Sequence, residues 1–292
     1  MMKKYGRQIT TVVVVLVFFV GCGLLVYPTF SDWWNSLHQS RAIMTYAEVV
    51  AKIDTEQYDE IWNAAYAYNE EIATDGVEWV LDDETRARYE SLLNLSDNGA
   101  MGYITIPKID VMLPLYHGTS ESVLQTSIGH LEGTSLPVGG PSSHSVLSGH
   151  RGLPSARLFS DLDRLVVGDR FTLNILDQVL TYEVDQIRIV EPTDLAPLMI
   201  EKGKDYCTLV TCTPYAINTH RLLVRGHRVE NEVLEKEIRI TADALQIDTI
   251  YVTPFVAAPV LMILFIILML APSGKEKQVD YSKMLQKESG GT

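Results

Sequence analysis

Two long segments without a charged residue constrain this 292-residue chain more than any other feature. The first runs from Ile9 to Phe30, and the second runs from Thr249 to Gly274 around an apolar centre at Phe255–Ala271. A helix that crosses a bilayer needs about 20 mainly apolar residues, and both segments reach that length. The chain is therefore expected to cross a membrane once or twice and to place one domain of roughly 200 residues in water.

Basic residues flank the two apolar segments on their outer sides. They are Lys3, Lys4, Arg7, Lys275, Lys277, Lys283 and Lys287. Because positive flanks tend to stay in the cytoplasm, both termini are expected there and the middle of the chain outside. The ranges expected are a cytoplasmic start at 1–8, a transmembrane signal anchor at 9–30, a second transmembrane helix at 249–273 and a cytoplasmic tail at 274–292. A cleaved signal peptide at the first segment is the alternative, although no small-x-small cleavage site follows it.

The part of the chain between these flanks is acidic. It holds 34 Asp and Glu against 17 Lys and Arg, a formal net charge of about −17. Nucleic-acid binding requires a basic face, so this charge argues against it. The charge indicates a soluble domain that is repelled by anionic surfaces.

The soluble part divides into a helical front at 31–101 and a β-rich body at 102–232, with a juxtamembrane segment at 233–248. Helices are predicted over 31–73, where Asp54-Thr-Glu-Gln57 resembles a capping box ahead of apolar residues at near-helical spacing. The front ends in a polar, irregular stretch that contains a short helical patch.

From Gly102 onward the pattern changes to short alternating runs with Gly and Pro between them. One strand is predicted at Tyr103–Val111, and a helix is expected at about 155–164. Further strands are predicted at Ser145–Ser148, Arg170–Leu176, Leu180–Val190, Tyr206–Thr211 and Arg221–Val229. Many short strands separated by turn signals are typical of a closed barrel or a sandwich, so the fold class is mainly β.

The run Thr208-Leu-Val-Thr-Cys212 brings one cysteine to the end of a predicted strand. Cys207 lies five residues earlier on that strand and faces the other side, too far away for a disulfide. Cys212 is therefore expected to be a free thiol outside the membrane, which suggests reactivity. Cys207 and Cys22 are expected to fill apolar space.

His150 and Arg221 are the residues that could make Cys212 reactive. His150 ends an apolar run, and Arg221 returns after the turn that follows Cys212. Positive charge lowers the pKa of a thiol, and a guanidinium can stabilise a developing oxyanion. The simpler alternatives are an inert buried thiol for Cys212 and a surface ion pair for Arg221, which is the favoured interpretation of Arg225. Spacing alone does not decide whether His150 is catalytic.

The other histidines are discounted, and no cofactor is expected. His117, His130 and His144 are predicted to occupy turns. A metal site is not expected either, because no cluster of His, Cys and Asp has the spacing of metal ligands.

Three strings around these residues resemble one protein family. They are His130-Leu-Glu-Gly-Thr-Ser-Leu-Pro-Val-Gly-Gly140, Ser148-Gly-His-Arg-Gly-Leu-Pro-Ser-Ala-Arg-Leu-Phe159 and Thr211-Cys-Thr-Pro-Tyr-Ala-Ile-Asn-Thr-His-Arg-Leu-Leu-Val-Arg-Gly226. They are similar to sortases, the cysteine transpeptidases of Gram-positive surfaces, and within these to the class C enzymes that polymerise pilins. The similarity spans about Gly102–Arg228.

The resemblance implies an eight-stranded β-barrel held at the cell membrane of a Gram-positive bacterium, with its catalytic domain outside. Cys212 would attack the Thr–Gly bond of an LPxTG-like sorting signal to form a thioacyl intermediate. A lysine amine of an acceptor pilin would resolve it, with His150 as general acid and base and Arg221 holding the carbonyl oxygen. The implied partners are pilins or other surface proteins with that signal, and membrane lipid.

Class C enzymes often carry a lid, an Asp-Pro-aromatic motif ahead of the first barrel strand. Here the region reads Asp75-Gly-Val-Glu78-Trp79, with an acid and an aromatic residue but no proline. The expectation is a mobile cover at 74–95, in which Trp79 reaches the thiol and Glu78 lies near Arg221. The alternative is a tryptophan that pins a surface loop to the barrel.

Two other functions stay open. A housekeeping sortase would transfer the same intermediate to the amine of a peptidoglycan cross-bridge. A non-enzymatic, membrane-tethered scaffold would use Cys212 only as a structural residue, although the spacing of thiol, imidazole and guanidinium argues against this.

Overall fold

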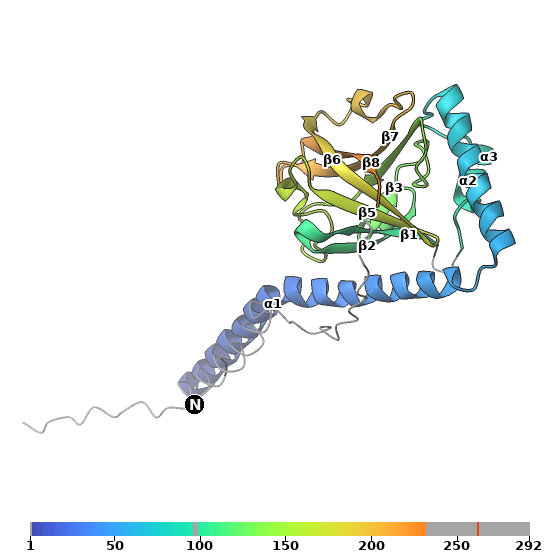
Figure 1. Ribbon diagram of the computed structural model, residues 1–292. Helices are drawn as coiled ribbons and strands as arrows, with labels where there is room; N and C mark the ends of the chain where they lie inside the picture. The colour runs from blue at the N-terminus through green and yellow to red at the C-terminus, as the bar shows by residue number, and fades with distance from the viewer. Residues whose placement is uncertain (1, 96–98, 232–261, 263–292) are drawn as a thin grey trace, which may run out of the picture. The chain divides into compact units, whose positions relative to one another are not determined.

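Eight strands close into a barrel in the order β1-β2-β3-β4-β7-β8-β6-β5 (Figure 1). The structure is a computed structural model that describes residues 2–95, 99–231 and 262. The strands are β1 Ala100–Ile106, β2 Val111–His117, β3 Ile128–His130, β4 Ser143–Ser148, β5 Arg170–Ile175, β6 Gln178–Val190, β7 Asp205–Thr213 and β8 His220–Val229. The barrel confirms the predicted fold class.

The helices described before the barrel are α1 Met2–Val50, α2 Thr55–Asp75 and α3 Asp83–Ser91. The short helix α4 (Glu121–Leu124) and the 3₁₀ turns η1 (Pro107–Ile109), η2 (Leu162–Arg164) and η3 (Ala196–Leu198) lie between strands. As the capping pattern predicts, the Asp54 side chain accepts a hydrogen bond from the backbone N–H of Gln57 at 2.9 Å. Figure 1 shows α2 and α3 beside each other along one side of the barrel.

The barrel interior is filled by the inward face of each long strand. Ile104, Leu209 and Val224 are fully buried and belong to one core cluster. Because side chains alternate along a strand, Val210 and Leu223 point outwards and belong to a second, smaller apolar cluster. The barrel therefore has an apolar patch on its outer surface in addition to its core.

The parallel pairing of β4 with β7 positions the end of β4. Ser148 lies opposite Val210 in this register. The pairing continues past β4, because the N–H of Gly149 donates to the carbonyl of Val210 at 3.1 Å. The Thr211 hydroxyl also donates to the carbonyl of Gly149 at 2.7 Å. The residues that follow β4 are thus held against the end of β7.

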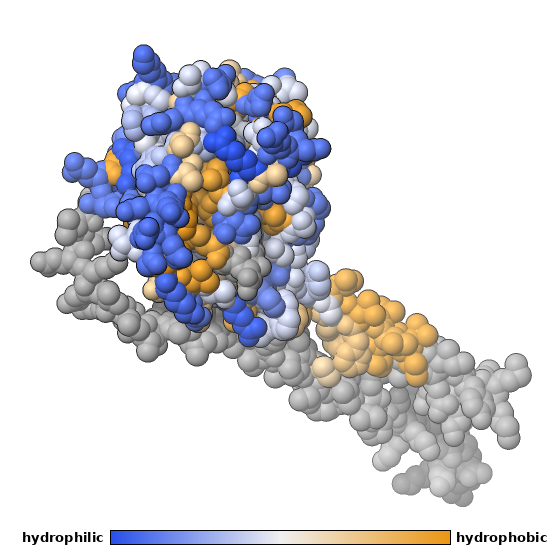
Figure 2. Space-filling view, turned by 90° about the vertical axis from the view of Figure 1, so that its right-hand side faces the viewer, coloured by the Kyte–Doolittle hydropathy of each residue, from blue (hydrophilic) through white to orange (hydrophobic). Residues whose placement is uncertain are grey.

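One continuous helix, α1, runs through the predicted membrane anchor and on into the soluble domain. Among the described residues it is the one helix long and apolar enough to cross a membrane. Figure 2 shows its apolar stretch beyond a mainly hydrophilic domain surface. Pro28 lies inside α1, and the helix changes direction along its length, as helices commonly do at proline. The predicted segments 233–248, 249–273 and 274–292 lie outside the described residues, apart from residue 262.

The later part of α1 is joined to the barrel domain by polar contacts. Tyr46 is buried, and its hydroxyl donates to the carbonyl of Met101 at 3.0 Å and accepts from the N–H of Leu176 at 2.8 Å. Closer to the membrane anchor, the Asn35 amide donates to the carbonyl of Ser155 at 2.7 Å. These bonds fix the direction in which α1 leaves the barrel.

Two predictions of local structure were wrong. The single strand predicted at Tyr103–Val111 is two strands, because Pro107 begins a 3₁₀ turn and Asp110 adopts a left-handed φ of 53°. The helix predicted at 155–164 is mostly irregular and ends in η2. Apolar residues of this stretch, such as Phe159, are buried from a loop rather than from one helix face.

The histidines predicted in turns lie instead in strands, since His117 and His130 end β2 and β3 and His144 lies in β4. Burial lowers the pKa of His130 to about 3, so its imidazole stays neutral. The Tyr89 hydroxyl from α3 lies 2.8 Å from His130 Nδ1 and accepts from the N–H of Gly118 at 3.1 Å. This contact anchors α3 to the barrel.

We expect Tyr46→Phe to lower the free energy of unfolding by about 1–3 kcal/mol, because it leaves a buried carbonyl and a buried N–H without their partner. Urea denaturation of the full chain measures the change. Tyr103→Phe is the control, since the half-buried Tyr103 hydroxyl makes no hydrogen bond to a described residue. Equal stability of the two variants would show that α1 is not held through Tyr46.

Candidate active site

Cys212 and Arg221 are direct cross-strand neighbours at the end of the β7–β8 hairpin that adjoins its connecting loop. Directly opposite residues of an antiparallel pair have Cβ atoms about 4.5–5.5 Å apart, close enough for both side chains to contact one bound group. Both side chains are partly exposed. The sequence prediction that Arg221 returns to Cys212 is consistent with this register.

His150 follows the end of β4 on the other side of Cys212. Because Ser148 is level with Val210, two further residues along each chain bring His150 level with Cys212. A glycine is required at position 149, between Ser148 and His150, since a Cβ there would lie 2.7 Å from the ring of Phe159. The three residues singled out in the sequence therefore lie on adjacent segments at one end of the barrel.

The imidazole of His150 has one charged neighbour in the described part of the chain. Its Nε2 lies 3.8 Å from a carboxylate oxygen of Glu121 on α4. The backbone carbonyl of His150 accepts from the N–H of Phe159 at 3.1 Å. Glu121 was not singled out by the sequence analysis, because it lies 29 residues before His150 in a polar turn.

Arg221 and Arg225 differ in how their guanidinium groups are used. In the described part of the chain, Arg221 Nη1 donates to two backbone carbonyls, those of Asn218 at 3.3 Å and His220 at 3.1 Å. Arg225 forms two bonds with Asp185, at 3.0 and 2.9 Å, and lies 4.0 Å from the ring centroid of Tyr206. Arg225 is thus the structural ion pair that was expected, and within the described residues Arg221 carries no ion pair.

Arg151 is a further charged residue beside the site that the sequence analysis missed. Its Nη2 lies 2.6 Å from Asp163, and its Nη1 donates to the Thr213 hydroxyl at 3.4 Å. This side chain joins the loop after His150 to the residue after Cys212. Its position directly after His150 was the only signal in the sequence.

The two cysteines of β7 have opposite environments. Cys207 is fully buried in the core, and burial raises the pKa of its thiol well above the ordinary value. Cys212 is partly exposed on the outer face, and both sulfurs are free. The expected absence of a Cys207–Cys212 disulfide is confirmed.

Trp79 packs on the outer apolar patch beside the candidate site. The buried members of this patch are Val146, Leu198 and Leu223, and its partly buried members are Trp79, Leu131, Val190, Leu195 and Val210. Val210 shares the outer face of β7 with Cys212, and Val190 is paired with Arg221. Trp79 therefore packs on the same outer cluster as Val210 and Val190, which neighbour Cys212 and Arg221 on the barrel surface.

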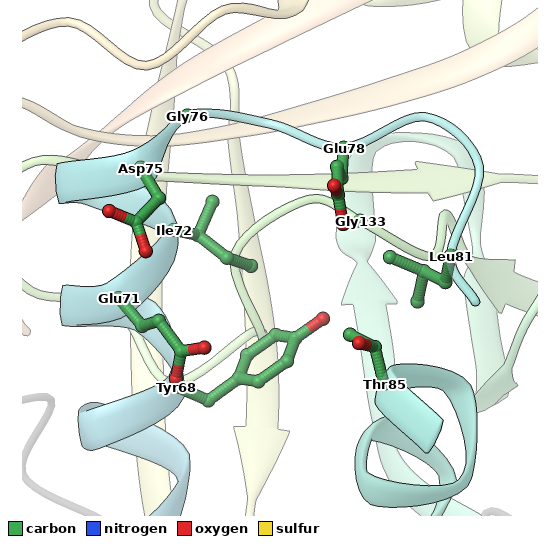
Figure 3. Close-up of a pocket in the computed structure, with 9 residues that line it drawn as sticks. All are labelled: Tyr68, Glu71, Ile72, Asp75, Gly76, Glu78, Leu81, Thr85 and Gly133. Carbon is green, nitrogen blue, oxygen red and sulfur yellow. The ribbon is translucent and has the colours of Figure 1, made fainter. Parts of the chain in front are cut away.

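Glu78 lies in a different environment from that of Trp79. It lines a pocket between α2 and α3 (Figure 3), and its backbone carbonyl lies where a Cβ of Gly133 would be, at 1.9 Å. Neither Glu78 nor Arg221 takes part in an ion pair among the described residues. The loop that carries Glu78 and Trp79 is thus seated on Gly133.

Known proteins share this fold and this site region. Residues 104–229 match the family model of the sortase domain. Sortase C1 of Streptococcus agalactiae is 62% identical, with a TM-score of 0.65 and coverage of 66% of this chain and 100% of that chain. Sortase C of Streptococcus pneumoniae, which is described for its catalysis and pilin substrate specificity, is 47% identical, with a TM-score of 0.60 and coverage of 65% and 97%.

A curated relative shows a shorter match. Sortase D of Bacillus subtilis is 30% identical over 133 residues, which are 44% of this chain and 64% of that protein. The chain therefore spans slightly less than two thirds of the length of this relative.

Proposed function

Since the chain belongs to the sortase family of cysteine transpeptidases, with class C enzymes among its solved neighbours, we propose that it joins sorting signals to pilin lysines. The substrate is an LPxTG-like signal cleaved between Thr and Gly. The product is an isopeptide bond to a lysine of the next pilin subunit. The pairing of Cys212 with Arg221, beside the end of β4, is the observation that carries this proposal.

Cys212 is the nucleophile of the proposed reaction. Its thiolate attacks the threonine carbonyl carbon, a carbon–sulfur bond forms, and the bond to the glycine nitrogen breaks. The lysine amine then attacks the thioester and releases the thiolate. The outward position of Cys212 on β7 supports this role, because a peptide can reach the sulfur without opening the core.

His150 moves the protons in both steps. It donates a proton to the departing glycine amine and accepts one from the incoming lysine amine. The register of β4 with β7 places His150 beside Cys212, and this supports the assignment. The partial exposure of His150 supports it as well.

Arg221 holds the carbonyl oxygen on which negative charge develops. A guanidinium offers five N–H donors in a fixed plane, and among the described residues only one nitrogen of Arg221 is engaged, with backbone carbonyls. The absence of an ion pair at Arg221 within the described residues leaves the other donors available to substrate.

The proposed location is the outer face of a Gram-positive cell membrane. α1 is long and apolar enough to serve as the anchor, and this supports membrane attachment of the domain. With 1–8 and 274–292 in the cytoplasm, 9–30 and 249–273 would cross the membrane and 31–248 would be extracellular. Pilins that bear sorting signals are themselves held at that surface.

The acceptor amine separates this proposal from its rival, a housekeeping sortase that uses a peptidoglycan cross-bridge. The full chain is mixed with candidate pilins that carry the sorting signal, with and without a cross-bridge peptide, and products are identified by mass spectrometry. Covalent pilin ladders support the pilin role. Transfer to the cross-bridge peptide alone would assign the housekeeping function instead.

The loop with Glu78 and Trp79 is the proposed cover of the site. The whole range 74–95 does not move in this proposal, because Tyr89 anchors α3 to His130. The movable part is the loop after α2, residues 76–80, which begins at Gly76 with a φ of 97°. The contact of Trp79 with the outer patch supports the proposal, since that patch includes Val210 and Val190, which neighbour Cys212 and Arg221.

We expect Cys212→Ala to abolish product formation and Cys207→Ala to retain most of it. Only Cys212 lies on the outer face beside His150 and Arg221, whereas Cys207 fills core space. The assay is ladder formation by each variant, with circular dichroism to confirm folding. Equal loss of activity in two well-folded variants would contradict the roles.

We expect Arg221→Lys to lower kcat/KM by about 10²–10³, because lysine keeps the charge but loses the planar donors. Arg225→Lys is the matched control and is expected to lower the melting temperature while leaving turnover nearly normal. The two effects are measured by peptide transfer and thermal unfolding. Near-normal turnover of Arg221→Lys would make Arg221 a structural charge only.

We expect Trp79→Ala to speed alkylation of Cys212 severalfold, because the outer patch is then open, with little change in melting temperature. Val80→Ala, at an exposed neighbouring position, is the control. Reaction with a bulky maleimide measures the rate. An unchanged rate with a stability loss of about 3–5 kcal/mol would identify Trp79 as a structural anchor instead.

A further inference from the structure

A pocket of about 170 Å³ lies behind the loop that carries Trp79 (Figure 3). Its walls come from α2, from the loop that follows it and from the first turn of α3. Ile72 and Leu81 supply apolar wall, and Gly133 of the β3–β4 connection closes one side. The pocket is distinct from the outer patch, because none of its lining residues belongs to that patch.

A buried hydroxyl without a partner points into this pocket. Tyr68 is 3% exposed, and its hydroxyl makes no hydrogen bond to any described residue. Figure 3 shows that hydroxyl directed to the middle of the pocket. Burial raises the pKa of Tyr68 to about 12, so the group stays neutral and its oxygen can accept a hydrogen bond. Buried polar groups in folded proteins usually have partners, so this one indicates a place for a ligand.

The rim of the pocket is negatively charged. Glu71, Asp75 and Glu78 line it, and none of its lining residues is a lysine, arginine or histidine. Arg88 neutralises Glu71 through a contact of 2.7 Å. Asp75 and Glu78 form no ion pair with a described residue, so two carboxylates remain to attract a cation.

We propose that this pocket binds a primary ammonium group, as carried by a lysine side chain of a protein partner. An ammonium has three N–H donors, which can be shared between the Tyr68 oxygen and the carboxylates of Asp75 and Glu78. The methylene stem then lies against Ile72 and Leu81. No set of three His, Cys, Asp or Glu within the described residues is arranged to hold a metal ion, so an organic cation fits better.

A compact ammonium suits the pocket better than a guanidinium. Arginine binds best through a planar fork that meets one carboxylate in a bidentate pair. Here the deepest acceptor is a single hydroxyl, and the carboxylates lie at the rim. An ammonium has no plane to align, so it can pair with a hydroxyl and a carboxylate that do not lie in one plane.

Occupancy of the pocket also acts on the proposed cover. Glu78 lines the pocket, and Trp79, the next residue of the same loop, packs on the outer patch. A ligand bound to Glu78 therefore stabilises the loop in its present position and opposes displacement of Trp79. This coupling rests on the proposed function of the loop, whereas ammonium binding itself does not depend on the chemistry of Cys212.

Calorimetric titration of the full chain in detergent micelles tests the binding. The probe is Nα-acetyl-lysine N-methylamide, and the norleucine and arginine analogues are its controls. We expect a Kd of about a millimolar for the lysine probe and no measurable binding of the norleucine analogue. Tyr68→Phe and Asp75→Asn should each weaken binding about tenfold, because each removes a hydrogen bond to a charged group. Glu70→Gln removes a charge from the same helix outside the pocket and should change nothing.

The measurement has outcomes that overturn the proposal. Equal binding of the lysine and norleucine probes would show that the pocket recognises only the apolar stem of the side chain. Tighter binding of the arginine probe would assign the site to guanidinium groups. Wild-type affinity in Asp75→Asn, which is exposed and not expected to affect folding, would remove the carboxylate from the site. Tyr68→Phe should keep its melting temperature, because the removed hydroxyl makes no hydrogen bond to a described residue.

The coupling to Trp79 is tested separately from catalysis. Saturating lysine probe should slow maleimide labelling of Cys212 in the wild-type chain and leave the rate unchanged in Trp79→Ala. Binding without slower labelling would retain the site and reject the coupling. Absence of pilin ladders in the transfer assay would leave both results unaffected.

Discussion

The parallel pairing of β4 with β7 is the constraint on which the candidate site depends. β7 is also paired with β8 in the antiparallel sense, so its last residues lie between two neighbouring segments. His150 reaches the site through the first pairing and Arg221 through the second. A shift of either register by one residue would turn the affected side chain to the opposite face of the barrel. The bond from the Thr211 hydroxyl to Gly149 closes the pairing where such a shift would begin.

The helical front is attached to the barrel through a small number of buried polar side chains. Tyr46 of α1 and Tyr89 of α3 each bond to backbone groups of the barrel. Asn69 of α2 exchanges two bonds with the backbone of Leu136, at 3.0 and 2.7 Å. Each bond satisfies a group that would otherwise be buried without a partner, so these contacts fix positions more precisely than apolar packing. The loop between α2 and α3 has no equivalent contact among the described residues, which makes it the part best able to move.

The strands were predictable where their signal was local. Alternation in Arg170–Leu176 and in Leu180–Val190 matches β5 and β6 closely, and the return of Arg221 to Cys212 follows from the short turn between two strands. The register also agrees with the grouping of His150 near Cys212. Sequence spacing left that grouping open, and only the resemblance to sortases supported it.

Other features could not be predicted, because they depend on residues far apart in the chain. β3 has only three residues, too few for a periodic pattern. The sequence predicts a turn at His130, because the partner that allows its burial, Tyr89, lies 41 residues earlier in the chain. Arg151 and Glu121 gain their places beside the site only when the barrel closes. The predicted helix at 155–164 failed because buried loop residues can imitate helical spacing.

Because α1 is continuous, it sets the distance between its uncharged stretch and the barrel domain. About five residues separate Phe30, at the end of the uncharged stretch, from Asn35, which bonds to Ser155 of the barrel domain, and this corresponds to about 7.5 Å along a helix. A helix keeps this distance nearly constant, whereas a flexible linker would let it vary. With the apolar stretch in a bilayer, the thiol would therefore stay within a narrow range of heights above the lipid. One turn added to or removed from this stretch would shift that height by about 5.4 Å and change which tethered substrates can present their signal to it.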